Sequence, residues 1–115
     1  MAKRKLLFIC TANINRSRTA EDLFKNSDKY EAQSAGFMMI SGTSGQIVTQ
    51  ELVNWADNIF VMDEVRDGHL RKLKSGFDVT GKQVEVLDIQ DMYDRGNFIL
   101  VDLLLSKLAS CGVRR

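Results

Sequence analysis

The sequence of 115 residues predicts one α/β domain, over residues 1–115, in which helices cover both faces of a parallel sheet. Two observations predict this class. The apolar runs at 6–9 and 59–62 show no alternation, which is typical of strands buried on both faces. Segments with helical periodicity separate such runs. Because right-handed crossovers bring the carboxyl ends of parallel strands to one edge, we expect the functional site at that edge.

The first half of the chain is predicted to form a strand, a helix, an edge strand and a loop. The first strand spans 5–10 and is apolar to its end at Cys10. A helix begins near Ser17, with Ala20, Leu23 and Phe24 on one face. Weak alternation at 30–34 predicts an edge strand, and the glycines and serines of 35–45 predict a loop.

The second half is predicted to supply three helices and two strands. Thr49 is a suitable N-cap for a helix whose inner face carries Leu52, Val53 and Ala56 and which Asp57 and Asn58 end. The later elements are, in order, a buried strand at 59–62, a charged surface helix at 65–73 with a solvated His69, a turn region at 76–82, a strand at 84–87 and an apolar helix at 97–109.

Composition argues against several classes of partner. Sixteen basic and fifteen acidic residues nearly balance, so neither nucleic acid nor an anionic membrane is expected to bind in bulk. The two cysteines are a hundred positions apart, which matches no metal-ligand spacing and no disulfide framework. The apolar run near the start is shorter than a signal sequence requires. We therefore expect a cytoplasmic protein.

The stretch CTANINRS, residues 10–17, places a cysteine at the exit of the first strand and an arginine after five intervening residues. A loop between a strand and a helix can turn its N–H groups inward, and the helix N-terminus adds positive potential. These donors form an anion cradle that also stabilises a thiolate at its base. The planar guanidinium of Arg16 can hold two phosphate oxygens, and Ser17 can cap the helix or donate to the sulfur.

A thiolate that displaces an alkoxide or phenoxide also needs an acid to protonate the leaving oxygen. The stretch LDIQDMYDRG, residues 87–96, supplies Asp88, Asp91 and Asp94 after the last predicted strand. Its position brings these carboxylates to the same edge of the sheet as Cys10.

These motifs resemble the low-molecular-weight protein tyrosine phosphatases, whose phosphate-binding loop has the pattern C-x5-R-S followed by a helix containing A-E. Thr19, Ala20 and Glu21 follow the loop here, and SAG at 34–36, WADNIFVMD at 55–63 and LDIQDMYD at 87–94 appear in the family's order. The similarity covers almost the whole chain and is closest to short bacterial members. It implies a four-stranded parallel sheet and a phosphocysteine mechanism without metal or cofactor.

The resemblance also implies roles for individual residues. Cys10 attacks phosphorus, Arg16 binds the transferred group, and Asp91 acts first as acid and then as base. Asn13 holds the loop in an unusual backbone conformation and Ser17 helps to activate the sulfur. The remaining implied site residues bind phosphate or lie beside the cleft: Thr11, Ala12, Ile14, Asn15, Tyr93 and the loop Phe37 to Met39.

The chain departs from the family pattern at three positions of the site. Asn15 stands where many members carry a second cysteine, so a protective disulfide with Cys10 is not expected. Arg18 replaces a proline and adds a cation near the mouth. Met92 replaces the proline of the acid motif, which leaves Asp88 as a second candidate for the acid.

Three functions remain open at this point. The first is hydrolysis of a phosphotyrosine protein or a small aryl phosphate. The second is arsenate reduction on the same fold, which needs resolving cysteines, and Cys111 is the other cysteine of the chain. The third is a phosphate- or phosphopeptide-binding module without turnover.

Overall fold

The computed structural model describes residues 3–40, 42 and 45–114. Four parallel strands form one sheet in the order β2-β1-β3-β4. The predicted α/β fold with a four-stranded parallel sheet is confirmed. The elements along the chain are β1 (Arg4–Cys10), α1 (Arg16–Leu23), β2 (Tyr30–Gly36), α2 (Gln50–Trp55), β3 (Asn58–Val61), α3 (His69–Gly76), β4 (Gln83–Val86) and α4 (Phe98–Ser110).

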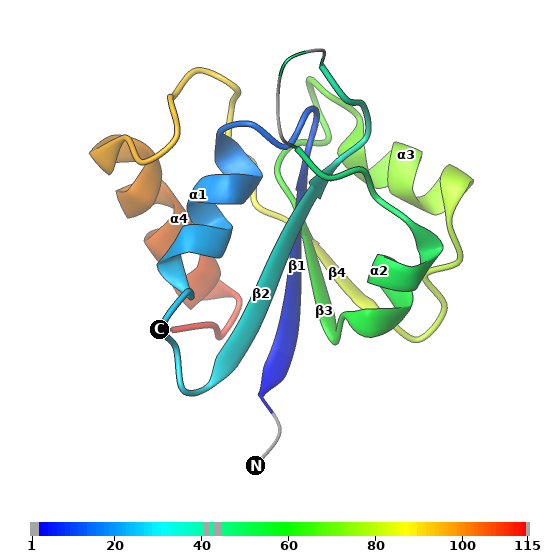
Figure 1. Cartoon of the computed structure of the whole chain (residues 1–115), viewed down its shortest axis with the longest axis horizontal. Helices are drawn as coiled ribbons and strands as arrows, with labels where there is room; N and C mark the ends of the chain where they lie inside the picture. The colour runs from blue at the N-terminus through cyan, green and yellow to red at the C-terminus, as the bar shows by residue number, and fades with distance from the viewer. Residues whose placement is uncertain (1–2, 41, 43–44, 115) are drawn as a thin grey trace.

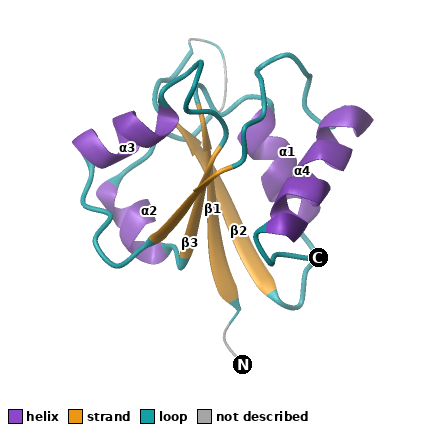
Figure 2. Cartoon of the chain, turned by 180° about the vertical axis from the view of Figure 1, so that it is seen from behind, coloured by secondary structure: helices purple, strands orange, loops and turns teal. Residues whose placement is uncertain are grey.

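The sheet separates two hydrophobic cores. Helices α1 and α4 cover one face, and α2 and α3 cover the other (Figures 1 and 2). Alternate residues of β1 enter opposite cores: Leu6, Phe8 and Cys10 face α1 and α4, whereas Leu7 and Ile9 face α2 and α3. This double burial explains why the apolar run in the sequence shows no alternation.

The carboxyl ends of the strands meet at one edge of the molecule, at the top of Figure 1. The loop from β1 to α1 begins there at Cys10, and the segment after β4 returns to the same edge, since the N–H of Ile89 donates to the Met62 carbonyl (2.7 Å). The predicted position of the two motifs at one edge is therefore confirmed.

Two elements, β2 and α3, differ from the sequence-based prediction by more than one residue at an end. β2 continues to Gly36, because Ala35 and Gly36 pair in register with Ile9 and Cys10. The predicted loop at 35–45 is thus shortened, and its positions 41, 43 and 44 lie outside the described residues.

Helix α3 begins at His69, four residues later than predicted. Gly68 has φ 65°, a left-handed conformation that interrupts a helix. The carboxylate of Glu64 accepts from the N–H groups of Leu70 (3.1 Å) and Arg71 (3.3 Å), which are otherwise unpaired at a helix start. A turn at 64–68 therefore replaces the first turn of the predicted helix.

The predicted N-cap of α2, Thr49, is confirmed, and in α4 the residue predicted to begin the helix, Asn97, is its N-cap. Thr49 Oγ1 accepts from the N–H of Leu52 (3.2 Å), and Asn97 Oδ1 accepts from the N–H of Ile99 (2.9 Å).

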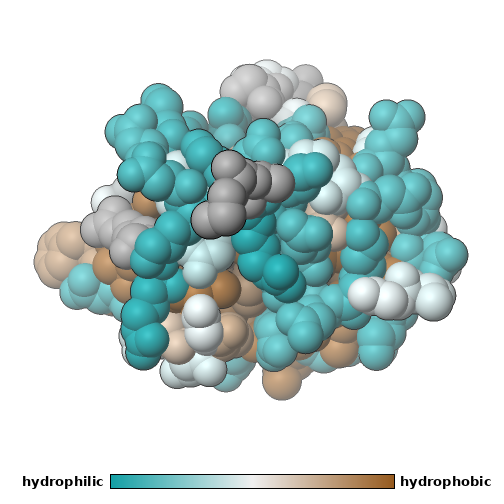
Figure 3. All heavy atoms as spheres, turned by 90° about the horizontal axis from the view of Figure 1, so that it is seen from below, coloured by the Kyte–Doolittle hydropathy of each residue, from teal (hydrophilic) through white to brown (hydrophobic). Residues whose placement is uncertain are grey.

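The end of the sheet opposite the Cys10 edge presents mainly hydrophilic side chains with apolar atoms between them (Figure 3). Among the helices of the described residues, none has the length and hydropathy needed to cross a bilayer.

Candidate functional site

The loop from Cys10 to Ser17, here called the cradle, is held by the side chain of Asn13. Asn13 has φ 53°, a left-handed conformation that asparagine tolerates better than most residues. Its Oδ1 accepts from the N–H of Gln46 (2.8 Å), which fixes the amide so that Nδ2 donates to Ser17 Oγ (2.8 Å). The unusual conformation expected for Asn13 is thus present, and its side chain braces the cradle from inside.

The SAG motif gives the cradle room and support. A Cβ on Gly36 would lie 2.6 Å from the Asn13 nitrogen, 2.7 Å from the Ala12 carbonyl carbon and 2.9 Å from the Thr11 oxygen. Only glycine permits this approach. Ser34 donates to Glu21, so the SAG motif of β2 is also linked to the A-E motif of α1. The spacing of these motifs in the sequence therefore has a packing basis.

The sulfur of Cys10 lies at the base of the cradle beside one hydroxyl. Cys10 is buried, and its Sγ is 3.0 Å from Ser17 Oγ. Because Ser17 already accepts from Asn13, its own hydrogen is available to donate to the sulfur. Ser17 lies inside α1 and does not cap it, so of the two predicted roles the structure supports donation to sulfur.

Arg16 is the largest fully buried side chain, with 1% of its surface exposed. Its Nη1 donates to Asp67 Oδ2 (3.0 Å) and to the Ile89 carbonyl (2.8 Å), and its Nη2 contacts Thr11 Oγ1 (3.4 Å). Burial of a guanidinium is costly unless an opposite charge pairs with it, and the carboxylate of Asp67 provides this negative charge. The arginine is therefore fixed beside the cradle before any ligand arrives.

Several hydrogen-bond donors at the cradle have no partner within the described part of the chain. The buried Nε of Arg16 is one of them. The backbone N–H groups of residues 12–15 also donate to none of the other described residues. A buried donor without an acceptor, such as the Arg16 Nε, is rare in proteins, and together with a row of unpaired backbone N–H groups it points to an anionic ligand. A tetrahedral oxyanion above Cys10 would satisfy them.

His69 was predicted to be solvated, and this prediction is wrong. The ring is fully buried and lies beside the cradle, with its centroid 5.6 Å from that of the Phe37 ring at an interplanar angle of 33°. Its Nδ1 accepts from the N–H of Asp63 (3.0 Å), so the neutral ring carries its proton on Nε2, which lies 2.9 Å from Thr11 Oγ1 and donates to it. Burial, and then the Arg16 cation, lower the pKa of His69 to about 4. The ring is neutral at neutral pH.

The structure separates the three candidate acids. Asp91 Oδ2 lies 3.8 Å from Arg16 Nη2, and 58% of the side chain is exposed. Asp88 instead accepts from Arg66 (3.1 Å) and has φ 56°. Asp94 is exposed, and its backbone carbonyl accepts from the N–H of Asn97. Of the three, the structure brings Asp91 to the guanidinium of the cradle.

The remaining site residues predicted from the sequence lie around the cradle at different depths. Phe37 and Met38 donate through their N–H groups to the Thr11 carbonyl (2.8 and 3.1 Å), which places the start of the predicted wall loop against the cradle. Tyr93 is partly buried and packs on the core beneath α1 and α4. Four cradle residues are partly exposed: Thr11, Ala12, Ile14 and Asn15.

Sequence reasoning missed three residues that shape this site. Asp67 pairs with Arg16 from a turn that was predicted as helix, and His69 contacts Thr11 from the start of α3. Gly36 ends β2 against the cradle. Gly36 had a sequence signal, because a glycine at the exit of a strand next to the site often marks a close approach of backbones. The other two depend on contacts across more than fifty positions.

No set of three or more His, Cys, Asp or Glu side chains suited to a metal ion occurs in the described ranges. The donors of this site are amides, a guanidinium and hydroxyls, which bind anions. The chemistry of the donor set is therefore that of an anion site.

Comparison with known proteins supports this interpretation by a match of sequence and by a match of structure. Residues 5–52 match the family model described as low molecular weight phosphotyrosine protein phosphatase, a range that contains the whole cradle and the SAG motif. A comparison with curated protein sequences gave no match.

Solved structures match the chain over almost its whole length. The low molecular weight protein tyrosine phosphatase from T. tengcongensis is 21% identical, with a TM-score of 0.71 over 95% of this chain and 99% of that one. The YwlE arginine phosphatase from Geobacillus stearothermophilus is 20% identical, with a TM-score of 0.70 over 94% and 92%. A thioredoxin-dependent arsenate reductase from Corynebacterium glutamicum is 17% identical, with a TM-score of 0.65 over 96% and 61%.

These three relatives are named for different reactions, so the shared fold does not by itself choose a substrate. The family model matches the part of the sequence that contains the cradle, and the likeness of fold covers nearly the whole chain. The resemblance to the low-molecular-weight protein tyrosine phosphatase family is thus confirmed, by the sequence of residues 5–52 and by the fold of nearly the whole chain.

Proposed function

We propose that this protein hydrolyses phosphate monoesters through a phosphocysteine intermediate on Cys10. The observation that carries the proposal is the set of unpaired donors around a buried cysteine: the Arg16 Nε and the N–H groups of residues 12–15 as far as the described residues extend. These donors suit the oxygens of a phosphoryl group, which carry the charge that the reaction must stabilise.

In the first step, the Cys10 thiolate attacks phosphorus in line with the leaving group. A P–S bond forms and the P–O ester bond breaks, while the carboxyl of Asp91 gives its proton to the leaving oxygen. Ser17 donates to the thiolate before attack, at an Sγ–Oγ distance of 3.0 Å. Arg16 and the cradle amides bind the non-bridging oxygens, which supplies most of the transition-state stabilisation.

In the second step, water attacks the phosphocysteine. The Asp91 carboxylate takes a proton from this water, the P–S bond breaks, and inorganic phosphate leaves with the Cys10 thiolate restored. The same aspartate thus returns to its protonated state and no other acid is needed. The distance of 3.8 Å between Asp91 Oδ2 and Arg16 Nη2 supports a position of the carboxyl beside the transferred group in both steps.

We propose an aryl phosphate, such as phosphotyrosine in a protein, as the substrate class. Tyr93 lies on the acid-bearing segment and Phe37 directly follows β2 beside the cradle, and both side chains are partly exposed. Aromatic side chains favour a flat, apolar leaving group by stacking. This choice is separate from the chemistry of the cradle, which fits any phosphoryl group.

Arsenate reduction is less well supported by the positions of the cysteines. Cys111 follows the last turn of α4, which runs from the Cys10 edge toward the other end of the sheet (Figure 1). Burial, and then the charge of Glu85, raise the pKa of the Cys111 thiol, so it is a poor nucleophile at neutral pH. Asn15 occupies the cradle position at which a second cysteine could form a disulfide with Cys10.

The test is a pH–rate profile of the purified protein with an aryl phosphate. We expect hydrolysis that is lost in Cys10→Ser, and a basic limb that is lost in Asp91→Asn but kept in Asp88→Asn and Asp94→Asn. Phosphotyrosine and phosphoarginine peptides compared under the same conditions test the substrate class. Phosphate or vanadate binding without turnover at any pH would instead indicate a binding module and refute the proposal.

A further inference from the structure

The segment that carries Asp91, residues 89–96, is tied to the cradle at both of its ends. At the first end, Arg16 Nη1 donates to the Ile89 carbonyl (2.8 Å). At the other end, the backbone N–H of Arg95 donates to Asn15 Oδ1 (3.1 Å). Because Asn15 and Arg16 are adjacent in the chain, one short stretch of the cradle holds both ends of the segment.

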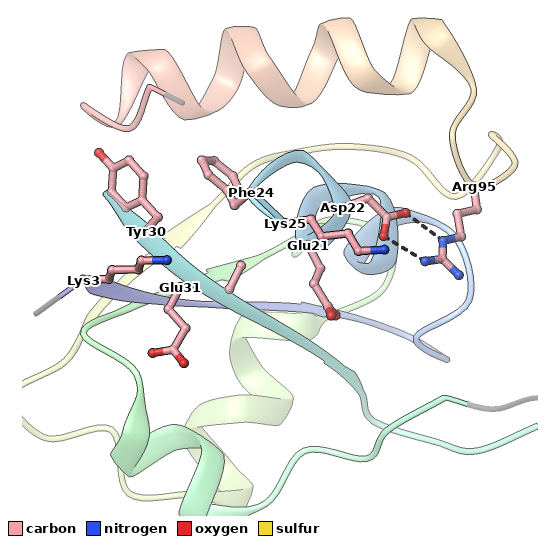
Figure 4. Close-up of a pocket in the computed structure, with 9 residues that line it drawn as sticks. Lys3, Glu21, Asp22, Phe24, Lys25, Tyr30, Glu31 and Arg95 are labelled. Atoms are coloured by element: carbon pink, nitrogen blue, oxygen red, sulfur yellow. Dashed lines mark hydrogen bonds and ion pairs between the residues drawn. The ribbon is translucent and has the colours of Figure 1, made fainter. Parts of the chain in front are cut away.

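The Arg95 end has two further ties, both to α1. The guanidinium of Arg95 binds both carboxylate oxygens of Asp22, at 2.8 Å each. Figure 4 shows Arg95 reaching from its loop to Asp22 on the helix. The N–H of Gly96 donates to Thr19 Oγ1 (3.0 Å). The hydrogen bond from Arg95 lowers the pKa of Asp22, so the pair stays ionised over the neutral range.

Asp91 itself has weaker support between these ends. Its side chain is 58% exposed, and its contact with Arg16 is 3.8 Å long. Tyr93, two residues further, packs only partly on the core. The position of the carboxyl therefore depends on where the two ends of the segment are fixed.

From these contacts we infer that Asn15 and Arg95 are positioning residues, which hold the 89–96 segment so that Asp91 reaches the leaving oxygen. This inference rests on the proposed function, in which Asp91 is the acid. Asn15 would then link the cradle to the segment that carries the acid. The ion pair of Arg95 with Asp22 would hold Arg95 in place for this hydrogen bond from outside the phosphate site.

The kinetic test compares two substrates that differ in how much they need an acid. The nitrophenolate of p-nitrophenyl phosphate leaves readily, whereas the phenolate of phenyl phosphate depends on proton donation. For Asn15→Ala and Arg95→Ala, we expect kcat/KM to fall about tenfold with phenyl phosphate and about twofold with p-nitrophenyl phosphate. Arg95→Lys, which retains a cation for Asp22, should recover part of the loss.

A general loss of structure would lower both rates equally, so the ratio between the two substrates is the decisive value. The matched control is Asn26→Ala, because Asn26 is exposed after the end of α1 and lies outside the site. Equal losses with both substrates, or a wild-type ratio in Asn15→Ala and Arg95→Ala, would overturn the inference while leaving Cys10-dependent hydrolysis intact.

Amide hydrogen exchange tests the tie independently of turnover. We expect the Arg95 N–H to be protected in the wild-type protein and to exchange at least about tenfold faster in Asn15→Ala. Wild-type exchange at Arg95 in that variant would overturn the inference. An inactive wild-type protein in which the tie is present would instead count against the proposed function.

Discussion

Replacing Gly36 with alanine tests the cradle through the addition of one methyl group. The new Cβ would lie 2.6 Å from the Asn13 nitrogen and 2.7 Å from the Ala12 carbonyl carbon, whereas ordinary contact begins at 3.4 Å. All of the opposing atoms belong to the backbone, so no side chain can rotate away. The cradle would have to move by about 0.8 Å, or β2 would have to separate from β1.

The magnitude of the effect follows from this displacement. Overpacking of this kind costs about 1–3 kcal/mol of the free energy of unfolding, which a domain of this size can tolerate. A shift of about 1 Å in a catalytic group can reduce the rate about 100-fold. We therefore expect Gly36→Ala to fold, to unfold at a lower temperature, and to lose about two orders of magnitude in kcat/KM.

The matched control is Gly76→Ala at the end of α3. A Cβ on Gly76 would meet nothing within 4 Å, and the added methyl group should leave activity unchanged while it stabilises the helix by up to about 1 kcal/mol. Both variants are measured by thermal denaturation and by hydrolysis of an aryl phosphate, with inorganic phosphate as a competitive inhibitor. Wild-type kcat/KM and phosphate affinity in Gly36→Ala would refute the reasoning about the cradle.

Two other predictions concern His69 and Ser17. The folded ring has a pKa of about 4 against an ordinary 6.5, so between these values the unfolded chain binds a proton that the folded protein does not. The free energy of unfolding should therefore fall as pH falls from 6.5 to 4, by at most about 3 kcal/mol, and His69→Gln should reduce this dependence in denaturant titrations; an unchanged slope would contradict it. For Ser17→Ala, we expect about a tenfold lower kcat/KM, because the hydroxyl 3.0 Å from the Cys10 sulfur is lost. The control is Ser75→Ala at an exposed position of α3, which should leave kcat/KM unaltered. Equal values of kcat/KM in the two variants would exclude a role of Ser17 in activating the sulfur.

Much of the fold could be predicted from the sequence because local pattern and tertiary environment agree. The runs at 6–9 and 59–62 are buried on both faces, as their lack of alternation indicates. Thr49 caps α2 by a contact with Leu52, three residues away, which is a local signal that the sequence contains. The cradle was predictable for the same reason, since Cys10 and Arg16 are close in the chain.

The sequence-based predictions were wrong where a contact with a distant residue outweighs the local sequence pattern. The charged residues from 65 onward predict a surface helix, but the Glu64 carboxylate and the left-handed Gly68 delay α3 to His69. Once α3 starts there, the His69 ring is buried against Phe37 and Thr11. Neither the ring's burial nor the pairing of Asp67 with Arg16 follows from residues near it in the sequence.

The choice of acid shows an intermediate case. The sequence narrowed the candidates to three aspartates on one segment, and the structure brings Asp91 nearest to the cradle by its contact with Arg16. Asp88 is engaged by Arg66, a residue of the turn that sequence reasoning had assigned to a helix. Sequence could therefore predict the type of residue and its segment, while the arrangement of two loops distinguishes the individual side chain.

Trapping of the covalent intermediate tests the central claim most directly. The protein is mixed with a phosphorus-labelled aryl phosphate, quenched in acid within the first turnover, and digested for peptide mapping. We predict one phosphoryl group per protein on the peptide that contains Cys10, and none in Cys10→Ser. Phosphate release by the wild-type protein without a label at Cys10, or with the label on another residue, would contradict the account.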